Sequence, residues 1–265
     1  MTTASPLAGR TALVTGAGGP LGRAFSLALA AAGVRVLLVG RNPVTLAETL
    51  AEVEKEADGG GGAGRIALAD VADPASVAAL AETFGGDENV SILVNNAGIA
   101  GPVKPLVDVE PDEWDEVFAA NVRGVYLLCR AFLPPMLAAG RGDIVNVASV
   151  SGKRPLLNRT PYTASKMALL GLTRTLAGEV GPSGVAVNSL SPGPIHGPRM
   201  ARNFRLEAEL TGTTPEAAEH AFASRAALGR LVENHEVATA LVAMLAMPGL
   251  CGADIDLSAG MIAPA

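Results

Sequence analysis

The sequence predicts an α/β fold in which helices cover both faces of one doubly wound parallel sheet of about seven strands. Short apolar runs alternate with helical stretches along the chain, which is typical of parallel strands joined by right-handed crossovers. A glycine-rich turn follows the first apolar run, and short polar motifs follow several others. Because ligands of such folds bind where the strands end, these motifs predict one site at the carboxyl edge of the sheet.

The composition fits a single domain that spans residues 1–265. Hydrophobic residues make up 49% and aromatic residues only 3%, so the predicted core is built from small aliphatic side chains. The net charge is −6 and no basic run occurs, which argues against nucleic acid or an anionic membrane as a partner. The start of the chain does not resemble a signal peptide, and no uncharged apolar run reaches about 20 residues. A cytoplasmic location is therefore expected.

The two cysteines, Cys129 and Cys251, show neither metal-ligand spacing nor the pattern of a disulfide framework. Both lie among apolar residues. We expect two buried free thiols and no metal site.

The first four strands are expected at 11–14, 34–39, 66–69 and 90–94, and the helices after them at 23–32, 43–57, 74–84 and 112–139. Gly33 suits the C-cap of the first helix, and Asn42 suits the N-cap of the second, with Pro43 as its first residue. Three further strands are expected at 144–148, 185–189 and 253–257. The helix that carries Tyr162 and Lys166 is expected to reach about Val180.

The glycine-rich stretch TGAGGPLG, from Thr15 to Gly22, joins the first strand to the first helix. Free backbone N–H groups and the helix dipole converge at such a turn and favour a pyrophosphate. The turn therefore predicts a nucleotide site.

Tyr162 and Lys166 lie one helical turn apart, so their side chains share a face of the predicted helix. A nearby ammonium favours the phenolate form of tyrosine, lowers its pKa from about 10, and makes its proton transferable near neutral pH. Ser149 directly follows the fifth strand, where its hydroxyl can bind a substrate oxygen beside the phenol. Taken alone, the Tyr–Lys pair also fits a half-buried ring beside a solvated amine, so its interpretation depends on the other motifs.

These motifs make the chain similar to the classical short-chain dehydrogenase/reductase family over nearly its full length. The 13 residues from Ser149 to Tyr162 also match the family's spacing. The matching pieces, in the family's order, are TGAGGPLG, Asp70-Val71, NNAG at 95–98, Asn121, Ser149, YTASK at 162–166, and Asn188 with SPGPI at 191–195. The resemblance implies a Rossmann-type fold and an NAD(P)(H)-dependent oxidoreductase that interconverts a ketone or aldehyde and an alcohol.

The resemblance also implies roles for single residues. Tyr162 would be the general acid or base, and Lys166 would lower its pKa and hold the nicotinamide ribose. Ser149 would bind the carbonyl oxygen, and Asn121 would hold a water in a proton relay. The remaining cofactor contacts would come from Gly16, Gly18, Gly19, Leu21, Gly22, Asp70, Val71, Asn96, Ala97, Gly98, Pro192, Gly193 and Ile195. Plainer alternatives are a surface position for Asn121, a turn cap for Asp70 and a turn former for Asn96.

The end of the second strand predicts a preference for NADP(H), with NAD(H) possible. An NAD site usually has an acidic residue at the position of Gly40, whereas the guanidinium of Arg41 can clamp a 2′-phosphate. Alternatively, Arg41 turns to solvent or stacks on the adenine.

Three positions depart from the family pattern. Pro20 replaces a glycine of the loop, which the fold tolerates if Pro20 is the first helical residue, although one phosphate contact would weaken. Many family members have a threonine that touches the cofactor near the position of Gly197, and a glycine cannot make that contact. The segment 256–260, DLSAG, differs from the usual V-D-G-G.

The segment 198–227 resembles the family's substrate-binding lid, with a helix start at Thr214-Pro215. Basic residues on the lid and on the loop between Ser149 and Tyr162 would favour an anionic substrate if they face the cleft, or else are solvated and salt-bridged: Lys153, Arg154, Arg159, Arg199, Arg202, Arg205 and Arg225. Leu156 and Leu157 could equally form an apolar wall. A 3-oxoacyl reductase and a carbonyl, sugar or steroid dehydrogenase all fit the sequence.

Two other function classes remain as alternatives: a lyase or epimerase on the same fold, and a non-catalytic nucleotide-binding protein. The intact set of Asn121, Ser149, Tyr162 and Lys166 argues against the second, because a scaffold does not need a phenol beside an ammonium. Family members are mostly tetramers, which implies a homotetramer or dimer paired through 112–139 and 162–180. The apolar stripe Val125, Leu128, Phe132 and Met136 fits this interface, or it covers the protein's own sheet.

Overall fold

The computed structural model describes residues 5–56, 64–85, 88–154 and 156–262, with the side chains of Arg199 and Leu210 excepted. Within them, seven parallel strands form one sheet in the order β3-β2-β1-β4-β5-β6-β7. The strands are β1 (Thr11–Thr15), β2 (Arg35–Gly40), β3 (Arg65–Leu68), β4 (Val90–Asn95), β5 (Gly142–Val147), β6 (Val185–Pro192) and β7 (Asp254–Leu257). The predicted fold is confirmed, and the strand order reverses direction between β1 and β4.

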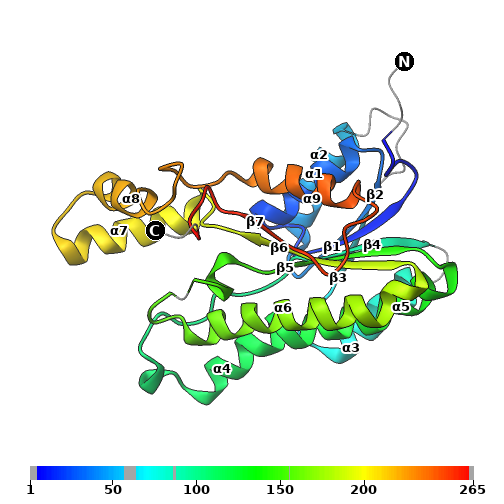
Figure 1. The fold of residues 1–265 in the computed structure, drawn as a ribbon, viewed down its shortest axis with the longest axis horizontal. Helices are drawn as coiled ribbons and strands as arrows, with labels where there is room; N and C mark the ends of the chain where they lie inside the picture. Colours follow the sequence, from blue (N-terminus) through cyan, green and yellow to red (C-terminus); the bar gives the residue numbers. More distant parts are fainter. Residues whose placement is uncertain (1–4, 57–63, 86–87, 155, 263–265) are drawn as a thin grey trace.

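Helices form a layer on each face of the sheet (Figure 1). One layer contains α1 (Pro20–Ala31), α2 (Pro43–Glu56) and α9 (Asn234–Leu245). The other contains α3 (Pro74–Phe84), α4 (Pro111–Phe118), α5 (Gly124–Ala139) and α6 (Thr160–Val180). Short 3-10 turns lie at Leu106–Asp108 (η1), Val150–Gly152 (η3) and Gly181–Ser183 (η4).

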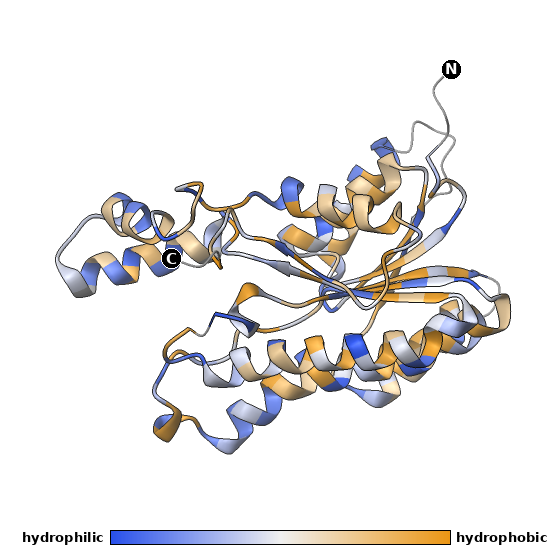
Figure 2. Ribbon diagram, viewed as in Figure 1, coloured by the Kyte–Doolittle hydropathy of each residue, from blue (hydrophilic) through white to orange (hydrophobic). Residues whose placement is uncertain are grey.

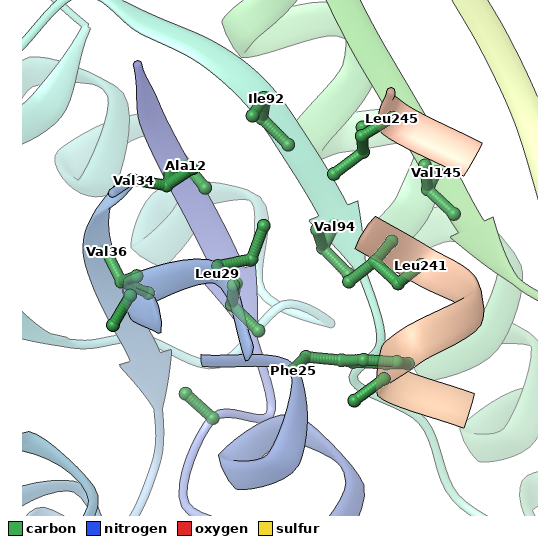
Figure 3. Packing of buried hydrophobic residues seen from close by; sticks show 14 of the residues in the cluster. Ala12, Phe25, Leu29, Val34, Val36, Ile92, Val94, Val145, Leu241 and Leu245 are labelled. Carbon is green, nitrogen blue, oxygen red and sulfur yellow. The ribbon is translucent and has the colours of Figure 1, made fainter. Parts of the chain in front are cut away.

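Each helical layer shares a core with one face of the sheet, because successive strand residues point to opposite faces. Ala12 and Val14 pack toward α1 and α9, whereas Leu13 packs toward the other layer. Figure 3 shows Phe25 of α1 and Leu241 of α9 in the first of these cores. Figure 2 shows the strands as mostly apolar between the two layers. Each fully buried aliphatic or Phe side chain contributes roughly 1.5–3 kcal/mol, which makes this double core the main source of stability.

Proline and polar caps begin the helices as the sequence predicts. Pro20 is the first residue of α1, and Asn42 accepts a 2.9 Å hydrogen bond from the backbone of Val44 at the start of α2. The last residue predicted for this second helix, Ala57, lies outside the described residues.

The predicted helix 112–139 is not regular. A π-helical turn, η2 (Ala119–Arg123), interrupts it between α4 and α5. This turn holds Asn121, whose side chain is fully buried, so the surface alternative for Asn121 is wrong. By length and hydropathy alone, Pro111–Ala139 could cross a membrane. A core helix meets the same criterion, and one face of α5 packs on the sheet.

The structure also decides one open alternative and corrects one expectation. The stripe Val125, Leu128, Phe132 and Met136 is buried in the core beneath the protein's own sheet, so it is not free to form an interface. Cys251 is exposed, whereas Cys129 is buried as expected. Cys251 follows the turn after α9 and lies beside Gly181, where an apolar sequence context does not guarantee burial.

Ion pairs fasten the amino-terminal edge of the sheet. Arg10, just before β1, is buried and pairs with Asp143 of β5 at 2.7 Å. Glu88, just before β4, is also buried and pairs with Arg35 at the start of β2 and Arg65 at the start of β3. Charged groups thus link five strands at this edge.

The chain leaves β6 to form α7 (Pro198–Thr211) and α8 (Pro215–Ala223), which project from the body of the molecule (Figure 1). The two helices share a small core of Met200, Phe204 and Ala218 with Leu231. Thr214 caps α8 as predicted, by accepting a 3.2 Å hydrogen bond from Ala217.

Candidate active site

The glycine-rich turn between β1 and α1 is shaped for a phosphate group. Gly16 has φ +66°, and a side chain on Gly22 would overlap the carbonyl oxygen of Gly16. Because Gly22 has no side chain, α1 can pack directly on the turn. The N-cap is Gly19, which has no side chain to satisfy the first amides of α1, so these donors remain available to an anion. The residues present therefore fit the pyrophosphate of a dinucleotide.

Asn96 and Thr15 join this turn to the end of β4. The Asn96 amide donates to the Thr15 carbonyl at 2.8 Å. The buried Thr15 hydroxyl accepts from the backbone N–H groups of Asn96 and Ala97, both at 3.0 Å. Asn96 thus holds the phosphate turn in place and is more than a local turn former. Thr15 opens the glycine-rich motif in the sequence, but the role of its hydroxyl in joining the two strand ends was not predicted.

Asn121 is fixed by three hydrogen bonds. Its Nδ2 donates to the Ile99 carbonyl at 2.9 Å and to Ser165 Oγ at 3.0 Å, while its Oδ1 accepts from the Ile99 N–H at 2.8 Å. A side chain on Gly98 would come within 2.7 Å of Asn121 Oδ1. The NNAG motif, η2 and α6 therefore meet at Asn121. The hydroxyl of Ser165, within the YTASK motif, donates to the Tyr162 carbonyl at 2.7 Å, a role that was not predicted.

Tyr162, Lys166 and Ser149 lie at the start of α6 and the end of β5. The ammonium of Lys166 lies 5.8 Å from the centroid of the Tyr162 ring and donates to the Val147 carbonyl at 2.7 Å. Lys166 is buried and Tyr162 is half-buried, so the ammonium faces the phenol in a poorly solvated setting. Ser149 Oγ accepts from the Ser151 N–H at 3.1 Å, which leaves its own proton to donate.

The expected adenine end of the site contains Arg41 and Asp70. Arg41 Nη1 lies 3.7 Å from Asp70 Oδ2, and the arginine side chain is 71% exposed. Asp70 Oδ1 also accepts from the Ala72 N–H at 2.9 Å, so the carboxylate does cap the following turn. Val71 is buried against Gly124, so its side chain packs inward.

The expected nicotinamide end lies where β6 leaves the sheet. A side chain on Gly193 would approach the Ser258 Cα within 2.7 Å, so the C-terminal segment packs on this corner. Ile195 forms a backbone bridge with Val232, and the His196 N–H donates to the Val232 carbonyl at 2.8 Å. Gly197 is the N-cap of α7 and has φ +154° and ψ −178°.

Most of the cations near this end are already paired. Lys153 contacts Asp254 and Asp256, and Arg154 donates to the Met261 carbonyl. Arg159 lies 3.5 Å from the Ala100 carbonyl and Arg225 stacks over Phe222. Arg202 and Arg205 are exposed on α7. The salt-bridged alternative therefore describes the loop cations better than an anion site does.

His196, His220 and His235 line one open pocket between α8 and the start of α9. The imidazole of His196 lies between Glu219 at 3.9 Å and Glu233 at 3.7 Å. Among the residues that the structure describes, no three His, Cys, Asp or Glu side chains are arranged to hold a metal ion.

Comparison with known proteins gives one consistent result. Residues 10–209 match the family described as short chain dehydrogenase. The chain is 36% identical over 259 residues to the 3-oxoacyl-acyl-carrier-protein reductase FabG of Pseudomonas aeruginosa, covering 96% of this chain and 98% of that protein.

Two solved structures extend the comparison. An NAD⁺-bound xylitol dehydrogenase matches with a TM-score of 0.87 at 28% identity, covering 96% of this chain and 100% of that one. The L-sorbose reductase of Gluconobacter frateurii, solved with NADPH and L-sorbose, matches with a TM-score of 0.90 at 25% identity, covering 99% and 100%.

Proposed function

Because this chain belongs to the short-chain dehydrogenase/reductase family and is an oxidoreductase of that family, we propose that it interconverts a carbonyl and an alcohol with Tyr162 as the acid or base. The observation that carries this proposal is the ammonium of Lys166, buried 5.8 Å from the Tyr162 ring centroid. The hydroxyl of Ser149 and the amide of Asn121 complete the set.

The chain's own residues position the reactants and move the proton. When bound, the nicotinamide cofactor supplies or accepts the hydride. In reduction, the Tyr162 hydroxyl donates its proton to the carbonyl oxygen, and the Ser149 hydroxyl donates a hydrogen bond to the same oxygen. The Lys166 ammonium stabilises the phenolate that Tyr162 leaves behind. Asn121 holds the backbone of Ile99 and the Ser165 hydroxyl, and so fixes the start of α6.

The test is Tyr162→Phe. Turnover should fall by about 10²–10⁴-fold because the proton donor is lost while the ring remains. The melting temperature should stay close to wild type, and the variant should still bind the cofactor. Tyr126→Phe is the matched control, because Tyr126 is the chain's other tyrosine and lies half-exposed on α5. Near-normal turnover in Tyr162→Phe would remove the tyrosine from the mechanism.

The cofactor is proposed to be NADP(H) in preference to NAD(H). Gly40 offers no carboxylate to repel a 2′-phosphate. The guanidinium of Arg41 is exposed and lies 3.7 Å from Asp70, a long contact that leaves it able to turn toward a phosphate. Gly16, Gly18, Gly19, Leu21 and Gly22 would hold the pyrophosphate.

The remaining cofactor contacts are proposed in two groups. Asp70 and the backbone of Val71, whose side chain packs inward, would contact the adenine. The nicotinamide half would be held by Asn96, Ala97, Gly98, Tyr162, Lys166, Pro192, Gly193 and Ile195.

The substrate is proposed to carry its carbonyl on an apolar group, beneath a lid formed by 198–227. Beside the Ser149 turn, the charge of Lys153 is neutralised by Asp254 and Asp256, and Arg154 donates to the Met261 carbonyl. On the same loop Leu156 is 41% and Leu157 is 90% exposed. An apolar substrate group would cover these two leucine side chains. An anionic group would have to compete with the internal partners that already bind Lys153 and Arg154.

A series of keto esters tests this preference. Each buried methylene contributes about 0.8 kcal/mol, which is about fourfold in kcat/KM. We expect kcat/KM to rise with chain length in the wild type and to rise less steeply in Leu157→Ser. A flat series, with faster turnover of open-chain polyols, would contradict the preference.

A homotetramer or dimer in the cytoplasm is the expected state of the enzyme. The apolar side chains that α5 and α6 leave exposed include Tyr126 and Met167, which are 49% and 51% exposed. These are better candidates for an interface than the buried stripe of α5.

A further inference from the structure

The turn that carries Ser149 is tied to the edge strand β7. Lys153 follows η3, and its ammonium contacts Asp254 Oδ2 and Asp256 Oδ1 of β7. Asp254 is itself fixed, because its Oδ1 accepts hydrogen bonds from the Ser189 hydroxyl at 2.8 Å and the Ser191 hydroxyl at 2.7 Å. Its side chain is 6% exposed. The ammonium therefore meets a rigid and poorly solvated partner.

The same turn is compact and rests on α6. The Gly152 N–H donates to the Ser149 carbonyl at 3.0 Å, and the Lys153 N–H donates to the Val150 carbonyl at 2.9 Å. A side chain on Gly152 would come within 3.1 Å of the Lys166 carbonyl carbon. The turn thus lies between the helix of Tyr162 and Lys166 on one side and β7 on the other.

Electrostatics keep this link closed over the working pH range. Partial burial opposes the charge of Lys153, but the carboxylates of Asp254 and Asp256, which accept hydrogen bonds from its ammonium, outweigh this and raise the pKa of Lys153 above its ordinary value of 10.5. A raised lysine pKa adds stability that is present below the ordinary value and lost as the pH rises past the folded-state value. The link should therefore persist at neutral and mildly alkaline pH.

We infer that Lys153 is a positioning residue, which sets the Ser149 hydroxyl relative to Tyr162 by clamping the Ser149 turn to Asp254 and Asp256. The inference rests on the proposed function, in which both hydroxyls bind one carbonyl oxygen. It also gives a physical role to Asp256, which opens the segment that departs from the family pattern. A displacement of about 1 Å at a reacting group can cost about 10²-fold in rate, so a loose turn should be visible in kcat.

The kinetic test compares Lys153→Met with Lys153→Arg. Lys153→Met should lower kcat by about 10- to 100-fold and leave KM for the cofactor within about twofold, because the cofactor contacts lie elsewhere. Lys153→Arg keeps the charge and should recover most of the loss. The matched control is Lys104→Met, since Lys104 pairs with Glu113 at 2.6 Å with similar exposure but off the Ser149 turn. An unchanged kcat in Lys153→Met, or an equal loss in Lys104→Met, would overturn the inference.

Hydrogen exchange tests the clamp without any substrate. The amides of residues 151, 152 and 153 should exchange about tenfold faster in Asp254→Asn than in the wild type. The same three amides should exchange faster by a similar factor in Lys153→Met. The double variant should add little to Lys153→Met alone, because that substitution already removes the contact with Asp254. Unchanged exchange at the turn, or faster exchange throughout the chain, would overturn the inference. If instead the turn loosens but no carbonyl compound is turned over by the wild type, the proposed function fails and the clamp stands.

Discussion

The proposed preference for NADP(H) assigns the choice of cofactor to two adjacent residues, Gly40 and Arg41. Gly40→Asp should move the ratio of kcat/KM for NADPH over NADH toward NADH. The new carboxylate would repel the 2′-phosphate and accept hydrogen bonds from a ribose 2′-OH. Loss of a charge-assisted contact of about 1.5–3 kcal/mol corresponds to about 10- to 100-fold. The side chain has room, because a Cβ at Gly40 lies 3.4 Å from Leu46 at its closest contact.

Gly40→Ala is the control, since it adds the Cβ without the charge. Its cofactor ratio should stay near that of the wild type. A wild type that prefers NADH, or an Asp variant with an unmoved ratio, would show that Arg41 does not select the phosphate.

Single residues were predictable where their spacing along one element decides their geometry. The interval from Tyr162 to Lys166 places an ammonium beside a ring whatever the rest of the chain does. Thr15 and Ser165 were not predictable in this way. Their hydroxyls bind groups 82 and 44 residues away, on Ala97 and Asn121. Their partners therefore depend on which strands and helices become neighbours.

The start of α7 gives a prediction for an element. Gly197 has a positive φ of +154° with an extended ψ, a conformation that strains other residues by about 1–3 kcal/mol. Gly197→Thr should lower the melting temperature by about 2–4 °C for each kcal/mol of strain. It should not improve cofactor affinity, although the family often has a threonine nearby.

Gly249→Thr is the comparison for this variant. Gly249 has open space around it and no positive φ, so the same substitution should cost little there. Equal melting temperatures for the two variants, or tighter cofactor binding by Gly197→Thr, would contradict the argument from strain.

Element boundaries were predicted to within a few residues because proline, Asn42 and Thr214 fix the helix starts by local hydrogen bonding. The break in the helix after Pro111 was not predicted. Residues 119–123 have an ordinary helical composition. The π-helical turn is stabilised by hydrogen bonds between the Asn121 side chain and Ile99 and Ser165. A pattern of polar and apolar residues contains no signal for such a distant contact.

At the scale of the whole molecule, the exposed apolar side chains of α5 and α6 lead us to expect that copies of this chain associate. Multi-angle light scattering should give a mass of two or four times the 26.7 kDa chain. Met167→Arg should shift it toward the monomer, because it adds a charge to the exposed apolar face of α6. Val44→Arg on α2 is the control for an added charge at another exposed apolar position. A monomeric wild type would exclude the interface.

The sequence predicts the parallel sheet but not the packing of every apolar stripe. Alternating strands and helices dictate the crossover connections. Whether Val125 and Phe132 pack on the protein's own sheet or on another subunit depends on how α5 is rotated about its axis. That rotation follows from η2 and from the close contact of Gly124 with Val71. The stripe could therefore be recognised in the sequence but not assigned.

The π-helical turn between α4 and α5 has a consequence for how such a site is gained and lost. A π-helical turn amounts to one extra residue inside an α-helix. Deleting Ala120 would return the stretch to a regular helix, with α4 and α5 still in phase and Phe132 still facing the sheet. The deletion would take Asn121 away from Ile99 and Ser165. One codon thus separates a chain that carries the complete polar set from one that keeps the fold and has lost a member of it.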